Sequence, residues 1–270
     1  MKNETFQFRR FGEYFRFDCV QTLRHRGRPL LLFAGLGLVY FVVVGLFSLI
    51  FTGTWHLPTM PERFGVFLLT MGILELYTAH LYGHLTDRKA GASAILLPAS
   101  RVEKYVSMLL IALVVVPLGV YAGYMLLDAL LTVIFPGIGP AIAGGARNAL
   151  VEFCERIGET DVEILDWVKP STFVCLCLLS HCLNFLFFLL CGLCFKKFKI
   201  LGALVVMYGI SVLLSLLSVF GLFPLVNGFE AAEDAIVFAK HFLNWCNAIA
   251  GILVLGLGWG VWRRLKTLQH

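Results

Sequence analysis

Hydrophobic residues make up 59% of the 270-residue chain and charged residues only 14%, whereas soluble domains contain about 25% charged residues. This balance excludes an ordinary soluble protein and indicates an integral membrane protein. The net charge of +5 is spread along the chain between apolar segments, so it does not indicate binding to nucleic acid.

The N-terminal segment comes before any run long enough to cross a membrane. Between residues 5 and 27 four side chains fall on one helical stripe, with Arg9 and Arg16 opposite. The stripe consists of Phe8, Phe11, Phe15 and Cys19. It predicts an interfacial helix on the inner leaflet, with its arginines near anionic membrane lipid; an ordinary basic juxtamembrane tail is the alternative. The first apolar run begins only near Pro29, so we expect no cleavable signal peptide.

Six apolar segments are long enough to cross a bilayer, whose hydrocarbon core needs roughly 20 helical residues. They lie at about 30–51, 64–85, 105–135, 172–195, 200–221 and 242–262. Continuous apolar runs favour helices over the alternating strands of a membrane barrel. The predicted fold class is an all-α integral membrane protein, a single polytopic domain over residues 1–270 with six transmembrane helices.

Lysine and arginine accumulate in the cytoplasmic loops of membrane proteins. If the N-terminus is inside, 17 of the 22 Lys and Arg residues fall in inner segments and 5 in outer segments. The asymmetry predicts that both termini are cytoplasmic.

Ionisable and amide side chains interrupt two of the spans. The second span contains Glu75 and His80, and the fourth contains His181 and Asn184. Polar groups at membrane depth commonly face protein or a cavity, so these four are candidates for a substrate pathway. The alternatives are hydrogen bonding near the inner interface for the first two and helix packing for the others. His80 and His84 are one turn apart, which alone is weak evidence for a metal site, and we expect none.

A helix-start signal stands just before the third span. In Ser100-Arg101-Val102-Glu103, the Ser100 hydroxyl can accept a hydrogen bond from the Glu103 amide, and the Glu103 carboxylate can accept one from the Ser100 amide. We therefore expect the third helix to begin at about Arg101. Within it, Pro117 predicts a kink, and Asp128 lies toward the outer end, where water or the external loop can reach it.

The inner loop before this helix carries charges of both signs, in Asp87, Arg88 and Lys89. Because Pro98 ends any helix that precedes it, residues 86–95 are predicted to form a short cytoplasmic helix, hinged separately from the third span. A charged helix of this kind is suited to contact another protein; the alternative for Arg88 and Lys89 is plain positive-inside anchoring.

The largest external segment spans residues 136–171. Two prolines near its start break the third helix, and four apolar side chains then share one helical face. These four are Leu150, Phe153, Cys154 and Ile157. We expect a short amphipathic external helix, which either shields a substrate exit or packs on the tops of the spans.

Five of the eight cysteines crowd the fourth span. Cysteine behaves as a small hydrophobe in apolar helices, and a structural zinc site needs four ligands in closed geometry, so we interpret them as packing residues. Only Cys154 lies in an external loop, and no external intrachain disulfide is expected. The lysines at 196, 197 and 199 predict a tight inner turn between the fourth and fifth spans.

The chain contains no Gly-x-x-x-x-Gly-Lys-Ser/Thr loop, the sequence that binds nucleotide phosphates in P-loop ATPases. Signatures of serine hydrolases, zinc proteases and potassium filters are also missing from the sequence. We therefore do not expect this chain to be an enzyme, and any ATP chemistry belongs to another subunit.

The stretch Leu96-Leu97-Pro98-Ala99-Ser100-Arg101-Val102-Glu103-Lys104-Tyr105 resembles the Leu-Pro-Ala-Ser-x-x-Glu-Lys-Tyr/Phe signature of small ABC-2-type exporter permeases, particularly those of Bacteroidetes-like bacteria. The expected topology is similar to that family over the whole chain. One feature departs from it, because the larger external insertion lies between spans three and four and not between spans five and six.

The resemblance implies a dimeric permease, made with a second copy or a paralogue, in the bacterial inner membrane. Two cytosolic ABC ATP-binding subunits would hold ATP and Mg, and this chain would need no cofactor. Residues 86–95 would be the coupling helix, seated in a groove of the ATPase. The residues expected to couple are Asp87, Arg88, Lys89, Ser93, Ser100 and Glu103.

The sequence thus favours the permease of an ATP-driven exporter that moves an amphipathic or lipid-like substrate out of the cytoplasm or inner leaflet. The first alternative is a non-transporting membrane scaffold or sensor subunit of an ATPase complex. The second is an intramembrane enzyme, for which Glu75, His80, His84 and His181 are the candidate catalytic side chains.

Overall fold

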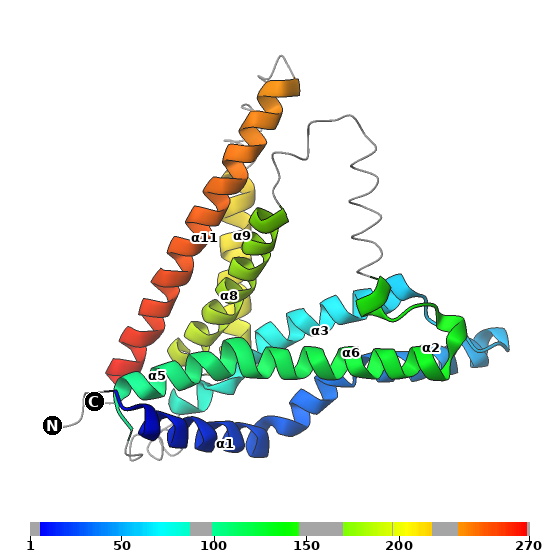
Figure 1. Ribbon diagram of the computed structural model, residues 1–270, viewed down its shortest axis with the longest axis horizontal. Coiled ribbons are helices and arrows are strands. Elements are labelled where there is room, and N and C mark those ends of the chain that lie inside the picture. Colours follow the sequence, from blue (N-terminus) through cyan, green and yellow to red (C-terminus); the bar gives the residue numbers. More distant parts are fainter. Residues whose placement is uncertain (1–5, 87–98, 146–169, 196, 218–231, 269–270) are drawn as a thin grey trace. The chain divides into compact units, whose positions relative to one another are not determined.

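The computed structural model describes residues 6–86, 99–145, 170–195, 197–217 and 232–268 (Figure 1). The expected all-α fold is confirmed for these residues, because every regular element among them is a helix. They fall into two compact units, each described below by itself. The first comprises Met1–Leu76 and Pro98–Thr160, and the second comprises Tyr77–Leu97 and Asp161–His270.

The first unit contains α1, α2, the first part of α3 and one long helix in three sections. The elements are α1 (Phe8–Ala34), α2 (Leu36–Thr52), α3 (Met60–Leu81), α5 (Arg101–Leu110), η2 (Ile111–Val115), α6 (Val116–Ile134) and η3 (Pro136–Ile138). α6 packs against both α1 and α2. A buried core of Val66, Phe67, Tyr124 and Ile142 joins α3, α6 and the segment after η3.

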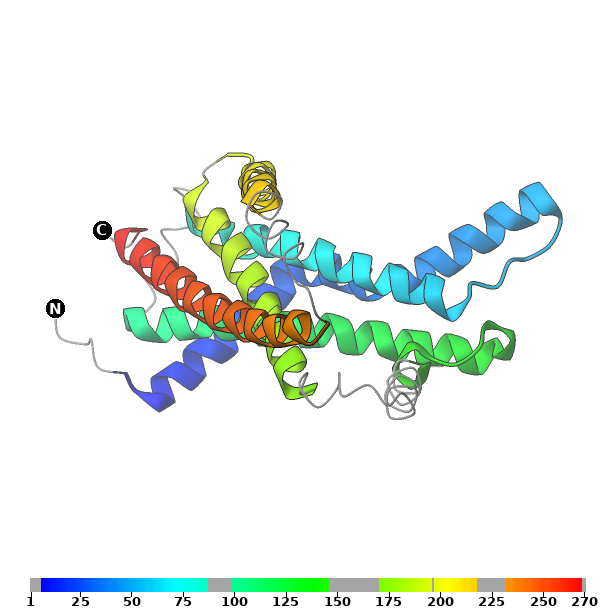
Figure 2. The same cartoon turned by 90° about the horizontal axis from the view of Figure 1, so that it is seen from above.

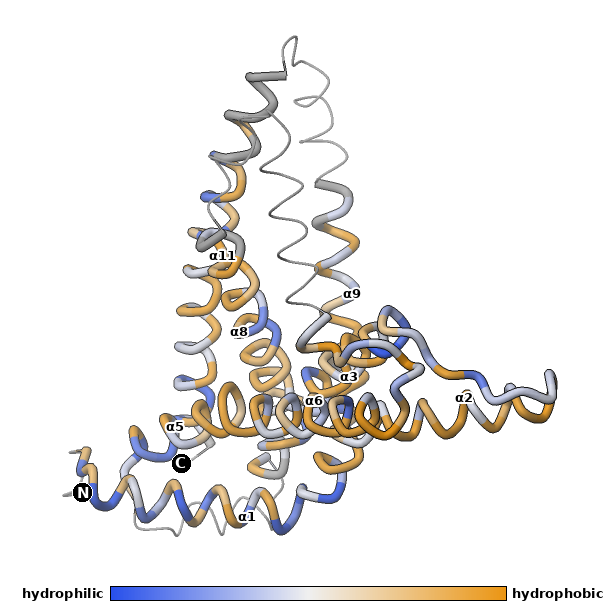
Figure 3. The backbone as a smooth tube through the Cα atoms, turned by 45° about the vertical axis from the view of Figure 1, so that its right-hand side comes forward, coloured by the Kyte–Doolittle hydropathy of each residue, from blue (hydrophilic) through white to orange (hydrophobic). Residues whose placement is uncertain are grey.

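α1 continues through Pro29 and ends before Gly35. The interfacial helix expected at residues 5–27 and the beginning of the span expected near residue 30 are therefore parts of one helix. The chain then bends by 46° into α2 at Gly35, and glycine is poorly suited to a helix interior. In Figure 3, α1 alternates between hydrophilic and hydrophobic residues, whereas α2 is mostly hydrophobic.

The end of α2 is anchored by aromatic rings. Gly53 follows it with a φ of 71°, in the left-handed region that favours glycine, and the chain reverses toward α3 (Figure 2). Trp55 lies so close to Gly45 that a Cβ atom there would overlap the indole ring. The Phe41 ring centroid is 6.1 Å from that of Trp55 and 5.0 Å from that of Phe135. These contacts fix α2 to its following loop and to the end of α6.

The expected third span is one helix of 34 residues, Arg101–Ile134. It begins at Arg101, as the capping box predicted. In place of a simple kink at Pro117, a π-helical turn (η2) stands just before it, where the Val116 amide donates to the Ile111 carbonyl five residues back. Pro117 has no amide hydrogen and its ring crowds the carbonyl four residues back, so the wider turn accommodates it.

The second unit contains the end of α3 and four further elements. These are η1 (Gly83–Thr86), α8 (Pro170–Cys194), α9 (Lys199–Leu217) and α11 (Ala232–Leu268). α8 is central because η1, α9 and α11 all pack against it. Gly192 of α8 lies so close to Ala79 of α3 that a Cβ atom would overlap the Ala79 carbonyl. The Asn247 side chain of α11 donates to the Thr172 carbonyl of α8 at 3.2 Å.

The tight turn expected between the fourth and fifth spans is confirmed. α8 ends at Cys194 and α9 begins at Lys199. Phe198, just before α9, has a φ of 52°, and the Lys199 ammonium group donates to the Gly83 carbonyl. The turn between these helices is therefore tied to η1.

Four described helices are long and apolar enough to cross a membrane, and the bent pair α1–α2 would make a fifth. The four are Met60–Leu81, Arg101–Ile134, Val174–Cys194 and His241–Thr267. Within α9 a shorter apolar stretch is described, Lys199–Leu213. These helices indicate a multi-pass membrane protein; the sixth span and the cytoplasmic termini stay predictions.

Candidate functional site

Glu103, at the start of α5, is the centre of a buried polar cluster in the first unit. Its side chain has no exposed surface. The capping box is complete, with the Ser100 amide donating to Glu103 Oε2 at 2.8 Å and the Glu103 amide donating to Ser100 Oγ at 3.3 Å. The helix start predicted from the sequence is thus confirmed, and local hydrogen bonds fix it.

The beginning of α1 supplies the other groups of this Glu103 cluster. The Arg10 guanidinium donates from Nε to Oε2 and from Nη2 to Oε1 of Glu103, each at 2.8 Å. The Gln7 backbone amide donates to Oε1 at 3.0 Å. A carboxylate withdrawn from water needs such partners, and a bidentate arginine–carboxylate contact is among the strongest hydrogen-bonded pairs in proteins. Glu103 therefore joins two helices across 93 positions of sequence.

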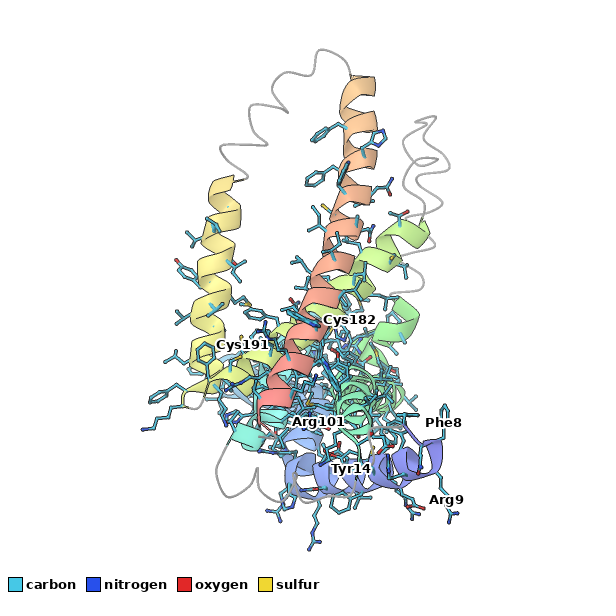
Figure 4. The ribbon with its side chains drawn as sticks, turned by 90° about the vertical axis from the view of Figure 1, so that its left-hand side faces the viewer. Phe8, Arg9, Tyr14, Arg101, Cys182 and Cys191 are labelled. Carbon is cyan, nitrogen blue, oxygen red and sulfur yellow. The ribbon has the colours of Figure 1, made fainter. Side chains whose placement is uncertain are left out.

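A second polar contact holds α1 against α5 further along. The buried Asp18 carboxylate accepts a hydrogen bond from the Ser107 hydroxyl at 2.8 Å, about two helical turns beyond Arg10. Phe8 and Arg9 instead project away from the helix packing (Figure 4), and the Arg9 side chain is 95% exposed. One side of α1 is thus attached to α5, while another is free to face solvent or lipid.

Another buried ion pair lies near the opposite end of the long helix. Arg63 of α3 donates from Nη1 to Asp128 of α6 at 2.6 Å, and each side chain is only 4% exposed. Nη2 of Arg63 donates to the Ile138 and Pro140 carbonyls at 3.0 Å and 2.7 Å. Oδ2 of Asp128 accepts from the Ile142 amide at 2.7 Å. This Asp128 cluster fastens the segment after α6, and the expectation that this segment reaches Asp128 is confirmed.

No protein-family model, curated protein or solved structure matches the chain. The resemblance to exporter permeases therefore rests on Leu96–Tyr105 and on the expected topology. Of that stretch the structure describes residues 99–105. It shows that Ser100 caps the start of α5 and that Glu103 attaches α1 to α5.

The residues expected to couple to an ATPase thus fall into two groups. Ser100 and Glu103 are buried, so neither side chain is placed for direct contact with a partner. The other four lie outside the described residues, with most of the helix expected at 86–95. They are Asp87, Arg88, Lys89 and Ser93. Most of the external segment, residues 146–169, lies outside the described residues as well.

The four candidate pathway residues belong to different units. Glu75 is half-buried on α3 in the first unit. In the second unit, His80 is exposed near the end of α3, and His181 and Asn184 are half-buried on α8. The His181 ring centroid is 4.5 Å from that of Phe185, one turn further along the same helix. Neither unit by itself gathers all four into a common site.

The described part of the chain holds no group of three or more His, Cys, Asp or Glu side chains that could bind a metal ion. On α8, Cys191 is buried and Cys182 is half-buried (Figure 4). The seven cysteines that the structure describes are all free; Cys154 is not among them. Within these residues the two ion-pair clusters are suited to position helices.

Neither ion pair was predicted from the sequence. Arg10 was counted only among the basic residues of the inner segments, and Arg63 only among those of the outer segments. One signal for the second pair was available. Asp128 is a single acid in a long apolar run, and a charge at such a place requires a partner. Arg10 offers no comparable signal, since it is one of several arginines near the N-terminus.

Proposed function

We propose that the chain is the membrane-spanning permease subunit of an ATP-driven exporter of the ABC-2 type. It moves an amphipathic or lipid-like substrate out of the cytoplasm or the inner leaflet, as a dimer with a second copy or a paralogue. Separate ABC ATP-binding subunits hold ATP and Mg and carry out hydrolysis. The complex belongs to the bacterial inner membrane, and this chain crosses it six times with both termini inside.

One observation carries the proposal: buried Glu103 fastens the start of α5 to α1. The inner loop that resembles a coupling segment leads directly into this start. Because buried, close-packed elements move together, displacement of the loop is passed to both helices. α5 is continuous with the rest of Arg101–Ile134, so the movement reaches the opposite end of a membrane-length helix.

Further support comes from the composition and from the helices. Four to five described helices are suited to cross a membrane, and 17 of the 22 Lys and Arg residues fall in the expected inner segments. The sequence lacks a P-loop, as expected of a permease that depends on a separate ATPase. Glu75, His80, His181 and Asn184 are the residues we propose to line the substrate pathway.

Purification from native membranes in mild detergent tests the proposal. We expect a P-loop ATPase to accompany the wild type, and the Arg88→Glu/Lys89→Glu variant to insert normally but to uncouple ATP hydrolysis from transport. The matched control is Arg263→Glu/Lys266→Glu, which makes the same charge change at two exposed residues of α11 and should leave coupling unchanged.

Two results count against a permease. A chain that purifies alone, without ATPase activity, contradicts the proposed partner. A complex that hydrolyses ATP but does not move a fluorescent phospholipid or a lipophilic dye across liposome membranes favours the scaffold or sensor subunit.

A further inference from the structure

The π turn η2 divides one continuous helix into two sections; α1 packs along both, but each section is held by a different buried charged cluster. On one side of it, α5 is held to α1 by the Glu103 cluster. On the other side, α6 is held to α3 by the Asp128 cluster. α1, α5, η2, α6 and the part of α3 that contains Arg63 all belong to the first unit. η2 therefore lies between two fixed ends.

The π turn sets the angle, measured around the helix axis, between the directions in which Glu103 and Asp128 leave the helix. Glu103 and Asp128 are 25 positions apart, and in a regular α-helix of 3.6 residues per turn they would lie about 20° apart around the axis. A π turn takes in one extra residue, which changes this angle to about 120°. The same helix can therefore direct Glu103 to α1 and Asp128 to α3.

The turn before Pro117 could be either a π turn, as observed, or an α turn, and Pro117 makes the hydrogen bonding of the two more similar. In an α turn the residue at 117 would donate to the Leu113 carbonyl, but proline has no amide hydrogen. An α turn at this place thus lacks one bond that it would otherwise gain over the π turn. The free-energy difference between the π turn and the α turn is therefore smaller here than in a helix without proline.

We propose that η2 is a joint about which α5 turns relative to α6. Conversion of the π turn to an α turn rotates one section by about 100° and lengthens the helix by about 1.5 Å. The Glu103 and Asp128 clusters hold the resting angle, since the rotation requires one of them to open. Release of the Glu103 cluster together with the Asp18–Ser107 hydrogen bond frees α5 to turn, and release of the Asp128 cluster frees α6. This joint does not depend on the proposed transport.

Spin labels scanned along the helix test the joint in lipid bilayers. Single cysteines are placed at residues 104–110 and 118–124 of a full-length chain that lacks its eight native cysteines, and oxygen accessibility is measured at each. Both scans follow the helical period, and the phase of each scan reports which face of its section meets lipid.

The double variant Arg10→Gln/Asp18→Ala opens the Glu103 cluster and removes the Asp18–Ser107 bond without changing the long helix itself. It is expected to shift the phase of the 104–110 scan by about 100° and to leave the 118–124 scan unchanged. Deletion of Val114, a partly exposed residue of η2, removes the extra residue of the turn. Both scans should then keep their resting phases, and the double variant should no longer shift the first one.

The joint is contradicted if Arg10→Gln/Asp18→Ala leaves the phase of the 104–110 scan unchanged, because η2 then only sets a fixed angle. An equal shift with and without Val114 also contradicts it, since the movement would not require the extra residue. If the double variant does not fold, Asp128→Asn applies the same test from the other end. There the 118–124 scan should shift, again only when Val114 is present.

Discussion

At the scale of single residues, two buried ion pairs decide where the ends of one long helix lie. Arg10–Glu103 and Arg63–Asp128 both place carboxylates where water does not reach. Such a pair adds little net stability, but the loss of one partner leaves an uncompensated buried charge and is strongly destabilising. These four residues should therefore tolerate substitution poorly even though they touch no substrate.

Asp128→Asn tests the burial of the second pair. The variant leaves the Arg63 guanidinium buried without its counter-charge, so we expect the free energy of unfolding to fall by about 3–5 kcal/mol. The control is Glu62→Gln, one residue before Arg63, which removes a surface pair with His56 at 3.4 Å and should change stability by less than about 1 kcal/mol. Thermal unfolding in detergent measures both, and equal midpoints would refute the buried pair.

Glu103→Gln separates the two roles of Glu103. Glutamine can still complete a capping box, so α5 should begin at the same residue. It cannot form the ion pair with Arg10, so the beginning of α1 should separate from α5. The backbone amides of that part of α1 should then exchange hydrogen faster. Glu13→Gln, which removes only an exposed contact with Arg9 at 3.6 Å, serves as the control. Unchanged exchange in Glu103→Gln would mean that the pair does not hold α1.

At the scale of elements, local signals were readable from the sequence and distant contacts were not. The capping box predicted the start of α5 because its four residues are consecutive. Pro117 predicted a disturbance of the helix, but a π turn and a kink both accommodate a proline, so its form was not determined. The continuation of α1 through Pro29 was missed because packing along α5 and α6 extends a helix that local propensity alone would end.

Gly192→Ala tests the close approach of α8 to α3. A Cβ atom at this position meets the backbone of Ala79, which cannot move as a flexible side chain can, so we expect a clear loss of thermal stability. In the control, Gly251→Ala of α11, nothing lies within 4 Å of the new atom, and stability should stay level or rise by up to about 1 kcal/mol. Equal behaviour of the two variants would contradict this packing.

At the scale of the whole molecule, the class of protein follows from the composition. The two ion-pair clusters follow from contacts between residues far apart in the sequence. The apolar runs alone predicted a helical membrane protein. The contacts that build the two clusters join residues 93 and 65 positions apart, and no periodicity in a single sequence encodes such partners. Glu103 was nevertheless singled out, since the capping box and the Leu96–Tyr105 signature share it.

We propose that this chain transmits the force generated by ATP hydrolysis on a separate subunit. The capped start of α5, fixed to α1, provides a path for movement from the inner loop into a membrane-length helix. The claim therefore requires a stable particle that contains both kinds of subunit.

Native mass spectrometry of the particle released from native membranes tests this claim most directly. The account predicts two permease chains, either two copies of this chain or one copy with a paralogue, bound to two P-loop ATP-binding subunits. A particle of this chain that contains no ATP-binding subunit, under conditions that keep its lipids bound, would contradict it.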